Sequence, residues 1–270
     1  MSRWLYYFFS IFTLARGVRN WLQLILLLLG RSRQETILEL RSSRGLPGLR
    51  FSVRSFMDAW IIKETCLDRD YEKHGTTLQD GWHIVDIGAG LGDFTIFAAQ
   101  RCPHGYVYAY EPFPESFALL RRNLELNNIS NVQAVCSAIS GRAVQSVPLY
   151  QMGEAVQHTT TLPADKAATL KTTDTISLTL DQVCAALPQC DFMKMDCEGA
   201  EYDILLNASA ATLAKIKRLS MEVHEGLIAP GRSRQELVDH LRRNGFQVTL
   251  TPNPVHAYLG FLYAAHIAHE

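Results

Sequence analysis

Three acidic residues, Asp196, Glu198 and Glu201, occur within six positions of one another in the segment DFMKMDCEGAEYDILL, residues 191–206. This segment has the pattern of a buried strand that runs directly into a helix. A protein core disfavours charges without a partner, so acids at such a junction are expected at the rim of a crevice. Carboxylates placed there can orient a hydroxyl group or accept its proton.

The residues around this junction allow several roles. Strand alternation places Asp196 and Glu198 on the same side, where we expect Asp196 to orient a substrate hydroxyl and Glu198 to contact the substrate. Glu201 begins the following helix and could either contact the substrate or pair structurally near the positive end of the helix dipole. Lys194, inside the strand, is expected to be the buried partner of one carboxylate. Cys197 could act as a nucleophile, but a small buried residue is the simpler interpretation.

A histidine at the end of a later strand is the second catalytic candidate. His224 closes the run RLSMEVH, residues 218–224. A neutral imidazole near pH 7 is suited to take a proton from a hydroxyl, and Asp196 is its competitor for that role. Asp196, Glu198 and His224 could also hold a divalent ion, although no Cys/His spacing typical of a metal site occurs in the chain. We therefore expect no metal.

A glycine-rich loop forms a second candidate site. Gly88, Gly90 and Gly92 directly follow a predicted strand and precede a predicted helix. Glycines in this context allow a tight turn and a close approach of a ligand to the backbone. The third glycine comes one residue earlier than in a dinucleotide fingerprint, and Asp93 stands where a third small residue is expected. Asp86, just before the loop, would repel a phosphate and attract an ammonium group.

An acid at the end of the next strand narrows the identity of the ligand. Glu111 follows Gly92 by 19 residues, a position that faces the ribose of a bound nucleoside in a doubly wound sheet. A ligand with a ribose, an ammonium group and no phosphate is S-adenosylmethionine. Ser137 and Ala138, after the third strand, are expected near its adenine. A nicotinamide-dependent oxidoreductase is the alternative, and the glycine spacing disfavours it.

Strands and helices that alternate along the chain must position these residues. From residue 82 onwards the pattern predicts an α/β fold with a mostly parallel, doubly wound sheet and helices on both faces. The predicted strands are 82–87, 106–111, 131–135, 192–195, 218–224, 246–250 and 257–265, and the predicted helices are 94–102, 112–128, 201–207 and 233–245. Short strands at 146–150 and 175–180 flank a Thr/Ala-rich stretch that we interpret as a mobile loop.

The N-terminal part of the chain differs in composition from the rest. We divide the chain into a basic and apolar helical segment at residues 1–35, a lead-in hairpin and helix at residues 36–80, and the main domain at residues 81–270. The apolar runs 4–15 and 21–29 are each shorter than the roughly 20 residues of a membrane span. We expect one or two amphipathic helices that either pack on the main domain or lie on a membrane surface.

Charge and cysteine content limit the class of protein. Residues 1–54 hold nine arginines and two glutamates, a net charge of +7 that leaves −8 for residues 55–270. This distribution favours peripheral contact with an anionic membrane over nucleic-acid binding, because the main domain has no basic stripe. The six cysteines show no CxxC motif, which indicates a reduced, cytoplasmic chain.

The motifs together carry a family resemblance. The runs VDIGAGLGDFTIFAA, YAYEPFPESFALLRRNLELNN, DFMKMDCEGAEYDIL and MEVH resemble the FkbM family of S-adenosylmethionine-dependent methyltransferases, and the similarity extends from about residue 36 to the C-terminus. The resemblance implies a Rossmann-like class I methyltransferase fold and methyl transfer to a hydroxyl of a sugar, a glycan, a lipid-linked acceptor or a polyketide. A non-catalytic, membrane-associated binding module is the remaining alternative.

Overall fold

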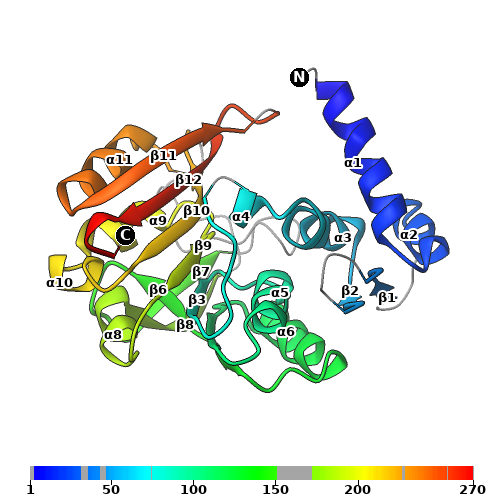
Figure 1. Ribbon diagram of the computed structural model, residues 1–270, viewed down its shortest axis with the longest axis horizontal. Helices are drawn as coiled ribbons and strands as arrows, with labels where there is room; N and C mark the ends of the chain where they lie inside the picture. Colours follow the sequence, from blue (N-terminus) through cyan, green and yellow to red (C-terminus); the bar gives the residue numbers. More distant parts are fainter. Residues whose placement is uncertain are drawn as a thin grey trace.

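The computed structural model describes residues 3–31, 36–42, 47–73, 75–150, 172–226, 229–253 and 255–269. Within these ranges it has the predicted α/β architecture, a central seven-stranded sheet with helices on both faces (Figure 1). The loop that we interpreted as mobile falls on residues 151–171, outside the described residues.

The order of the strands in the large sheet creates the site. The strands are, across the sheet, β11 (Phe246–Pro252), β12 (Leu259–His266), β10 (Arg218–His224), β9 (Phe192–Met195), β3 (His83–Ile87), β4 (Tyr106–Tyr110) and β5 (Val132–Val135). All neighbours are parallel except β12, which is antiparallel to both β10 and β11. From β3 the chain moves outward to β4 and β5, whereas from β9 it moves outward in the opposite direction. The crevice outside the carboxyl ends of β3 and β9 is therefore the expected ligand site.

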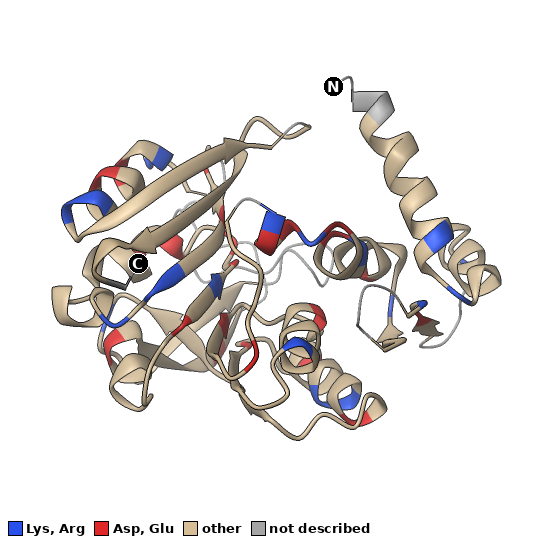
Figure 2. Ribbon diagram, in the orientation of Figure 1, with Lys and Arg blue, Asp and Glu red and all other residues tan. Residues whose placement is uncertain are grey.

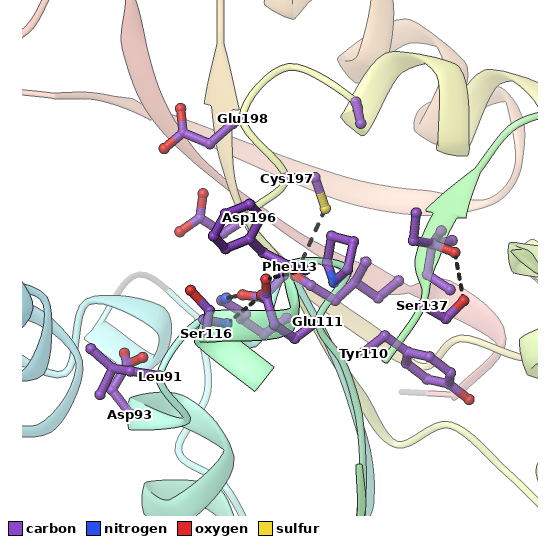
Figure 3. Close-up of a pocket in the computed structure, with 18 of the residues that line it drawn as sticks. Leu91, Asp93, Tyr110, Glu111, Phe113, Ser116, Ser137, Asp196, Cys197 and Glu198 are labelled. Atoms are coloured by element: carbon purple, nitrogen blue, oxygen red, sulfur yellow. Dashed lines mark hydrogen bonds between the residues drawn. The ribbon is translucent and has the colours of Figure 1, made fainter. Parts of the chain in front are cut away.

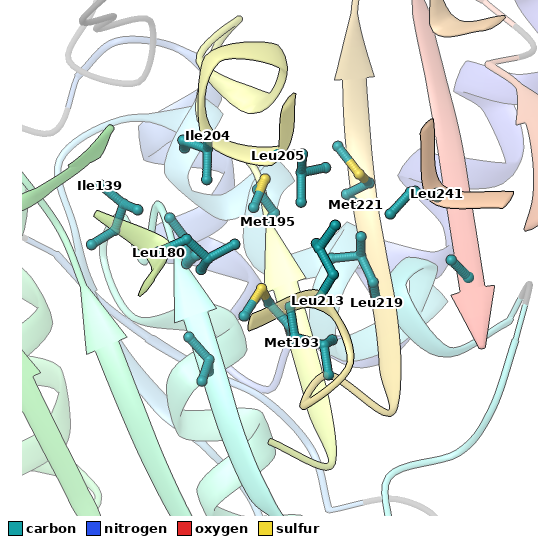
Figure 4. Close-up of a cluster of buried hydrophobic side chains, with 14 of the residues drawn as sticks. Ile139, Leu180, Met193, Met195, Ile204, Leu205, Leu213, Leu219, Met221 and Leu241 are labelled. Atoms are coloured by element: carbon teal, nitrogen blue, oxygen red, sulfur yellow. The ribbon is translucent and has the colours of Figure 1, made fainter. Parts of the chain in front are cut away.

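Two apolar clusters fill the two faces of this sheet. On one face Met193, Met195 and Met221 pack beneath helices of the C-terminal half, in a cluster shown in Figure 4. On the other face Ile84 and Phe192 pack against α5. Alternate residues of β3 and β9 thus point to opposite cores, as expected for strands that are buried on both faces. The helices of the main domain are α5 (Asp93–Arg101), α6 (Pro114–Leu126), α8 (Leu180–Ala185), α9 (Glu201–Asn207), α10 (Ala210–Leu213) and α11 (Arg234–Arg243), and η2 (Ile267–His269) closes the chain.

The N-terminal segments join the second of these cores. They comprise α1 (Arg3–Gly17), α2 (Trp21–Leu28), the predicted hairpin of β1 (Thr36–Glu39) and β2 (Arg50–Val53), α3 (Phe56–Ile62), the π-helical turn η1 (Lys63–Asp68) and α4 (Asp70–Lys73). Leu14, Val18 and Leu38 are buried in one cluster with Phe94 of α5. The predicted boundaries near residues 35 and 80 remain predictions, but one continuous core extends across both.

A small sheet lies beside the large one. It contains β6 (Ala138–Ser140), β8 (Thr172–Thr179) and β7 (Ser146–Tyr150), in that order. Charged residues are spread over both faces of the main domain, whereas α1 is uncharged along most of its length (Figure 2). Among the described residues, no helix has the length and hydrophobicity needed to cross a membrane.

Candidate active site

The glycine loop connects β3 to α5 and forms the floor of a pocket at the predicted crevice. Gly88 has a φ of 74°, and a Cβ there would lie 1.8 Å from the carbonyl oxygen of Asp196, so only glycine allows the loops after β3 and β9 to meet. Gly90 lines the pocket with no other atom within 4 Å of its Cβ position. Gly92 does not line the pocket; it lies against Leu120 of α6.

Glu111 is held at the pocket wall by the backbone. Its Oε2 accepts a hydrogen bond from the Gly90 amide at 2.7 Å, and its Oε1 accepts one from the Phe113 amide at 2.9 Å (Figure 3). Burial raises the pKa of this carboxyl group to about 7, although the two amide donors oppose the shift. Each carboxylate oxygen can accept more than one hydrogen bond, so the pair can also receive two hydroxyls of a ligand.

Ser137 and Ala138 lie across the same pocket, as Figure 3 shows for Ser137. The Ser137 hydroxyl is directed to the backbone, 3.0 Å from the carbonyl oxygen of Ala138 and 3.2 Å from that of Ile176. These two residues therefore form part of the pocket wall where β6, an outer strand of the small sheet, begins. Their position is compatible with the adenine contact expected from the sequence.

Asp86 lies elsewhere than the sequence suggested. The carboxylate is completely buried behind the glycine loop, where it accepts a hydrogen bond from Thr95 at 2.6 Å and lies 3.3 Å from Lys194 Nζ. It does not line the pocket, so it cannot meet a ligand ammonium group directly. Lys194 donates to the Gly88 carbonyl at 2.6 Å. Burial alone would lower the pKa of Lys194, but Asp86 holds it above its ordinary value.

The pair explains the error in the sequence prediction. Asp86 and Lys194 stand opposite each other in the register of β3 and β9. A buried charge needs a charged partner, and each residue supplies it for the other. Lys194 is thus the buried partner of a carboxylate, as predicted. That carboxylate is Asp86, before the glycine loop, and not an acid of the segment 191–206.

Asp196 lines the same pocket, and it has a partner that was not predicted from the sequence. Its Oδ2 accepts a hydrogen bond from the Tyr71 hydroxyl at 3.0 Å. Burial, followed by the charge of Asp196, holds the pKa of Tyr71 well above its ordinary value, so the phenol remains a donor. Asp93 also lines the pocket unexpectedly, and burial raises its pKa to about 6.

His224 is enclosed by acids at the end of β10. Its Nδ1 lies 3.0 Å from Glu201 Oε1, and its Nε2 lies 3.5 Å from Glu198 Oε2. Burial opposes protonation, but Glu201, then Glu198 and Glu222, outweigh it and raise the pKa of His224 to about 10. The surrounding acids therefore favour the imidazolium over the neutral imidazole. This surrounding does not fit the expected neutral base and favours Asp196, its competitor.

The two glutamates differ in access to the pocket. Glu198 lines it, and burial raises its pKa to about 7. Glu201 is fully buried and outside the lining, and its Oε1 accepts hydrogen bonds from the Cys197 amide and from His224. Of its two possible roles, the contacts support structural pairing. Burial holds the pKa of the Cys197 thiol well above its ordinary value, which supports the structural interpretation over a nucleophile.

The acids and the histidine also form a set of possible cation ligands. One donor atom from each of Asp196, Glu201 and His224 lies within 4.8 Å of the others. The sequence analysis named Glu198 in place of Glu201. A protonated imidazole is a poor ligand, because a metal binds the deprotonated nitrogen.

Comparison with known proteins gives consistent matches. The model of the "Methyltransferase FkbM domain" matches residues 86–248. The 31-O-demethyl-FK506 methyltransferase FkbM of Streptomyces tacrolimicus is 27% identical over 228 residues, 73% of this chain and 85% of that protein. Methyltransferase 1 of Beauveria bassiana is 30% identical over 166 residues, 54% of this chain and 65% of that protein. The AMB antimetabolite synthetase AmbE of Pseudomonas aeruginosa is 25% identical over 71% of this chain, which spans only 11% of the synthetase.

Solved structures share the fold at low sequence identity. A putative rRNA methylase from Clostridium thermocellum superposes with a TM-score of 0.51 at 11% identity, over 76% of this chain and 97% of that chain. A chain of the fibrillarin/Nop5p complex superposes with a TM-score of 0.50 at 13% identity, over 93% of this chain and 98% of that chain. At these identities the likeness concerns the Rossmann-like fold alone.

Proposed function

The chain belongs to the FkbM family of methyltransferases, and from this premise we propose that it methylates a hydroxyl oxygen of a small-molecule acceptor. Its methyl donor is S-adenosylmethionine. The observation that carries the proposal is the position of Asp196, a carboxylate oriented by Tyr71 at the wall of the glycine-loop pocket.

The pocket residues have separate roles in holding the cofactor. Glu111 receives the two ribose hydroxyls, since its oxygens are already fixed by two amides. Gly88 and Gly90 allow close approach of the cofactor to the loop. Ser137 and Ala138 border the adenine.

Asp86 and Gly92, which the sequence suggested as cofactor-binding residues, do not line the pocket, so we propose that they act through other residues. Asp86 fixes Lys194, whose ammonium group in turn fixes the Gly88 carbonyl, so we assign Asp86 a positioning role. Gly92 lets α5 and α6 pack closely and thereby orients the loop.

The transfer is an in-line displacement at the sulfonium methyl carbon. The acceptor oxygen forms a C–O bond while the C–S bond breaks, and the electron pair of that bond remains on the sulfur of S-adenosylhomocysteine. Asp196 takes the proton of the acceptor hydroxyl. Alignment of donor and acceptor can contribute roughly 7–11 kcal/mol, and a general base about 10²–10⁴-fold. His224, as an imidazolium, neutralises Glu201 and Glu198 and so fixes the loop that carries Asp196.

The acceptor class is narrower than that of methyltransferases in general. We propose a hydroxyl of a sugar, a glycan, a lipid-linked molecule or a polyketide, and the relative named for 31-O-demethyl-FK506 supports oxygen as the methylated atom. A net charge of −8 over residues 55–270 opposes a nucleic-acid acceptor. The family match disfavours a nicotinamide-dependent oxidoreductase.

Exposed apolar side chains favour a peripheral membrane position. Phe8, Phe9 and Phe12 of α1 are each more than half exposed, and so are Leu22 of α2 and Leu29 directly after it. We propose that they contact a membrane from the cytoplasm, and six free cysteines support a reducing compartment. Full-length protein should float with vesicles that contain anionic lipid, and Phe9→Asp with Phe12→Asp should abolish flotation. Equal flotation of both proteins would remove this part of the proposal.

Asp196→Asn tests the proposed reaction. The amide keeps the shape and can still accept from Tyr71, but it cannot take a proton. Calorimetry should give S-adenosylmethionine affinity within about twofold of wild type, while release of S-adenosylhomocysteine with a panel of hydroxylated acceptors should fall by about 10²–10⁴-fold. Unchanged turnover would exclude Asp196 as the base, and failure of the folded wild-type protein to bind the donor would contradict the assigned cofactor site.

A further inference from the structure

A second cavity, separate from the cofactor pocket, lies between the N-terminal helices and the main domain. It is bounded by α1, α2, α3 and the connection between β11 and β12, and we call it the N-terminal groove. Its volume is about 820 Å³. In Figure 1 the β11–β12 connection extends toward α1 across this region. The residues to which we assign roles in methyl transfer do not line this groove.

The lining of the groove is mostly apolar and includes two acids, Glu64 of η1 and Glu222 of β10. Ile11, Ile25 and Leu28 line one side, and Met57 and Trp60 of α3 line another. Glu222 of β10 also lines the groove, two residues before His224 in a strand whose carboxyl end borders the crevice. Met221 of β10 is the register partner of Met195 of β9, so Glu222 and Asp196, the next residue in each case, follow neighbouring positions of adjacent parallel strands. In keeping with this, burial and then the charge of Asp196 raise the pKa of Glu222.

Helix α3 separates the groove from the cofactor pocket. Ile61 lines the cofactor pocket, whereas its neighbour Trp60 lines the groove. The Trp60 indole donates to Glu64 at 2.8 Å, which fixes the ring in the wall. The two cavities thus lie against different residues of α3, and the groove reaches Glu222, whose strand neighbours the one that ends just before Asp196.

We propose that the N-terminal groove binds the hydrocarbon tail of an amphiphilic acceptor, whose hydroxyl-bearing head reaches Asp196. This inference rests on the proposed methyl transfer and narrows its acceptor to a lipid-like molecule. The mostly apolar lining matches a hydrocarbon chain, and Glu222, beside the strand that leads to Asp196, lies where the polar head would leave the groove. Helix α1, which lines the groove, also carries the exposed Phe8, Phe9 and Phe12, and these match the membrane from which such an acceptor would come.

The decisive experiment measures tail binding directly. Full-length protein with Trp4 and Trp21 replaced by Phe retains Trp60 in the groove and Trp82, which stacks on Phe192 in the core. Bromine quenches tryptophan on contact, so 9,10-dibromostearate below its micellar concentration should quench Trp60 saturably. Saturating S-adenosylhomocysteine should leave this binding within twofold, because the cavities are separate.

Two adjacent substitutions on α2 supply the matched control. Ile25 and Leu26 are 42% and 45% exposed, but only Ile25 of the two lines the groove. Ile25→Gln should weaken the binding of dibromostearate about five- to tenfold, through loss of one apolar contact. Leu26→Gln should change it less than twofold.

The alternative results are distinct. Absence of saturable quenching, or equal weakening by both substitutions, would overturn the tail site. Displacement by S-adenosylhomocysteine would place the fatty acid in the cofactor pocket and overturn it as well. Calorimetry with S-adenosylmethionine on the same proteins separates the two proposals, because loss of donor binding contradicts the methyl transfer and leaves the quenching result intact.

Discussion

Replacement of Glu111 by Gln should weaken the binding of S-adenosylmethionine and reduce its pH dependence. The carboxylate accepts hydrogen bonds from Gly90 and Phe113, and it is proposed to accept two more from the ribose. Hydrogen bonds to a charged group contribute about 1.5–3 kcal/mol each, and glutamine can replace only part of this pair, so we expect a loss of about 2–4 kcal/mol, or roughly 30- to 900-fold in affinity.

The pH dependence follows from the pKa of about 7 in the free protein. The ribose hydroxyls require the ionised carboxylate, so wild-type affinity should fall about tenfold for each pH unit below 7. Between pH 8 and pH 5.5 this amounts to a factor of roughly 30. Glu111→Gln should lose this factor, because the amide does not titrate. Asp93 and Glu198 line the same pocket, and any effect of their titration appears in both proteins.

The same carboxyl group affects the stability of the ligand-free protein. Its folded-state pKa lies above the ordinary value, so its contribution to stability is complete below about pH 4.5 and is lost as the pH rises through 7. A shift of this size corresponds to about 3 kcal/mol for a nearly buried group. Urea denaturation should therefore show a smaller decline from pH 5 to pH 8 for Glu111→Gln than for wild type.

Calorimetric titrations at four pH values between 5.5 and 8 test these expectations together. Any titration of the ligand itself appears in both proteins and cancels in the comparison. Wild-type affinity that is constant with pH, or donor affinity that survives the substitution, would refute the assignment of Glu111 to the ribose.

Three further predictions concern the buried charges and the loop contact. Lys194→Met should lower the free energy of unfolding by about 3–5 kcal/mol in urea titrations, because Asp86 loses its partner, and adding Asp86→Asn should restore part of this loss. Gly88→Ala should lower the melting temperature and abolish donor binding, since the new Cβ would overlap the Asp196 carbonyl. EDTA should leave turnover unchanged, because the sequence has no Cys/His spacing typical of a metal site.

For each of these predictions, one experimental result would contradict the reasoning. A Lys194→Met protein as stable as wild type would mean that Asp86 is neutral when buried. Full donor affinity in Gly88→Ala would mean that the loops after β3 and β9 can separate. Loss of turnover in EDTA that is restored by a divalent cation would assign the Asp196, Glu201 and His224 set to a metal.

Local sequence patterns predicted the elements of this fold well. The structure confirms β9, α9 and β10 at their predicted boundaries, residues 192–195, 201–207 and 218–224. A continuous apolar run that changes to helical periodicity after a glycine is typical of a buried strand followed by a helix. The helix predicted within the lead-in segment, residues 36–80, is less regular, because the chain forms the π-helical turn η1 after α3 and then places Arg69 at a φ of 59°.

Long-range contacts set the parts of the site that could not be predicted. Tyr71 donates to a carboxylate 125 positions later in the chain, and only the family resemblance covered its segment. The burial of Asp86 depends on the register between β3 and β9. The charge of His224 depends on Glu201, 23 residues away in the chain. Periodicity carries no information about such pairs, since they arise only when separate helices and strands come together.

The contact between Gly88 and Asp196 has a further consequence for how the two substrates bind. The glycine loop and the acid-bearing loop meet backbone to backbone, and Lys194 of β9 donates to the Gly88 carbonyl. A shift of the loop on donor binding must therefore displace Asp196, on which the acceptor hydroxyl depends. Thermodynamic reciprocity then requires that the donor changes the affinity for the acceptor by the same factor by which the acceptor changes the affinity for the donor. Because Gly88 has no side chain, the two loops can touch, and this contact couples the binding of the donor to the binding of the acceptor.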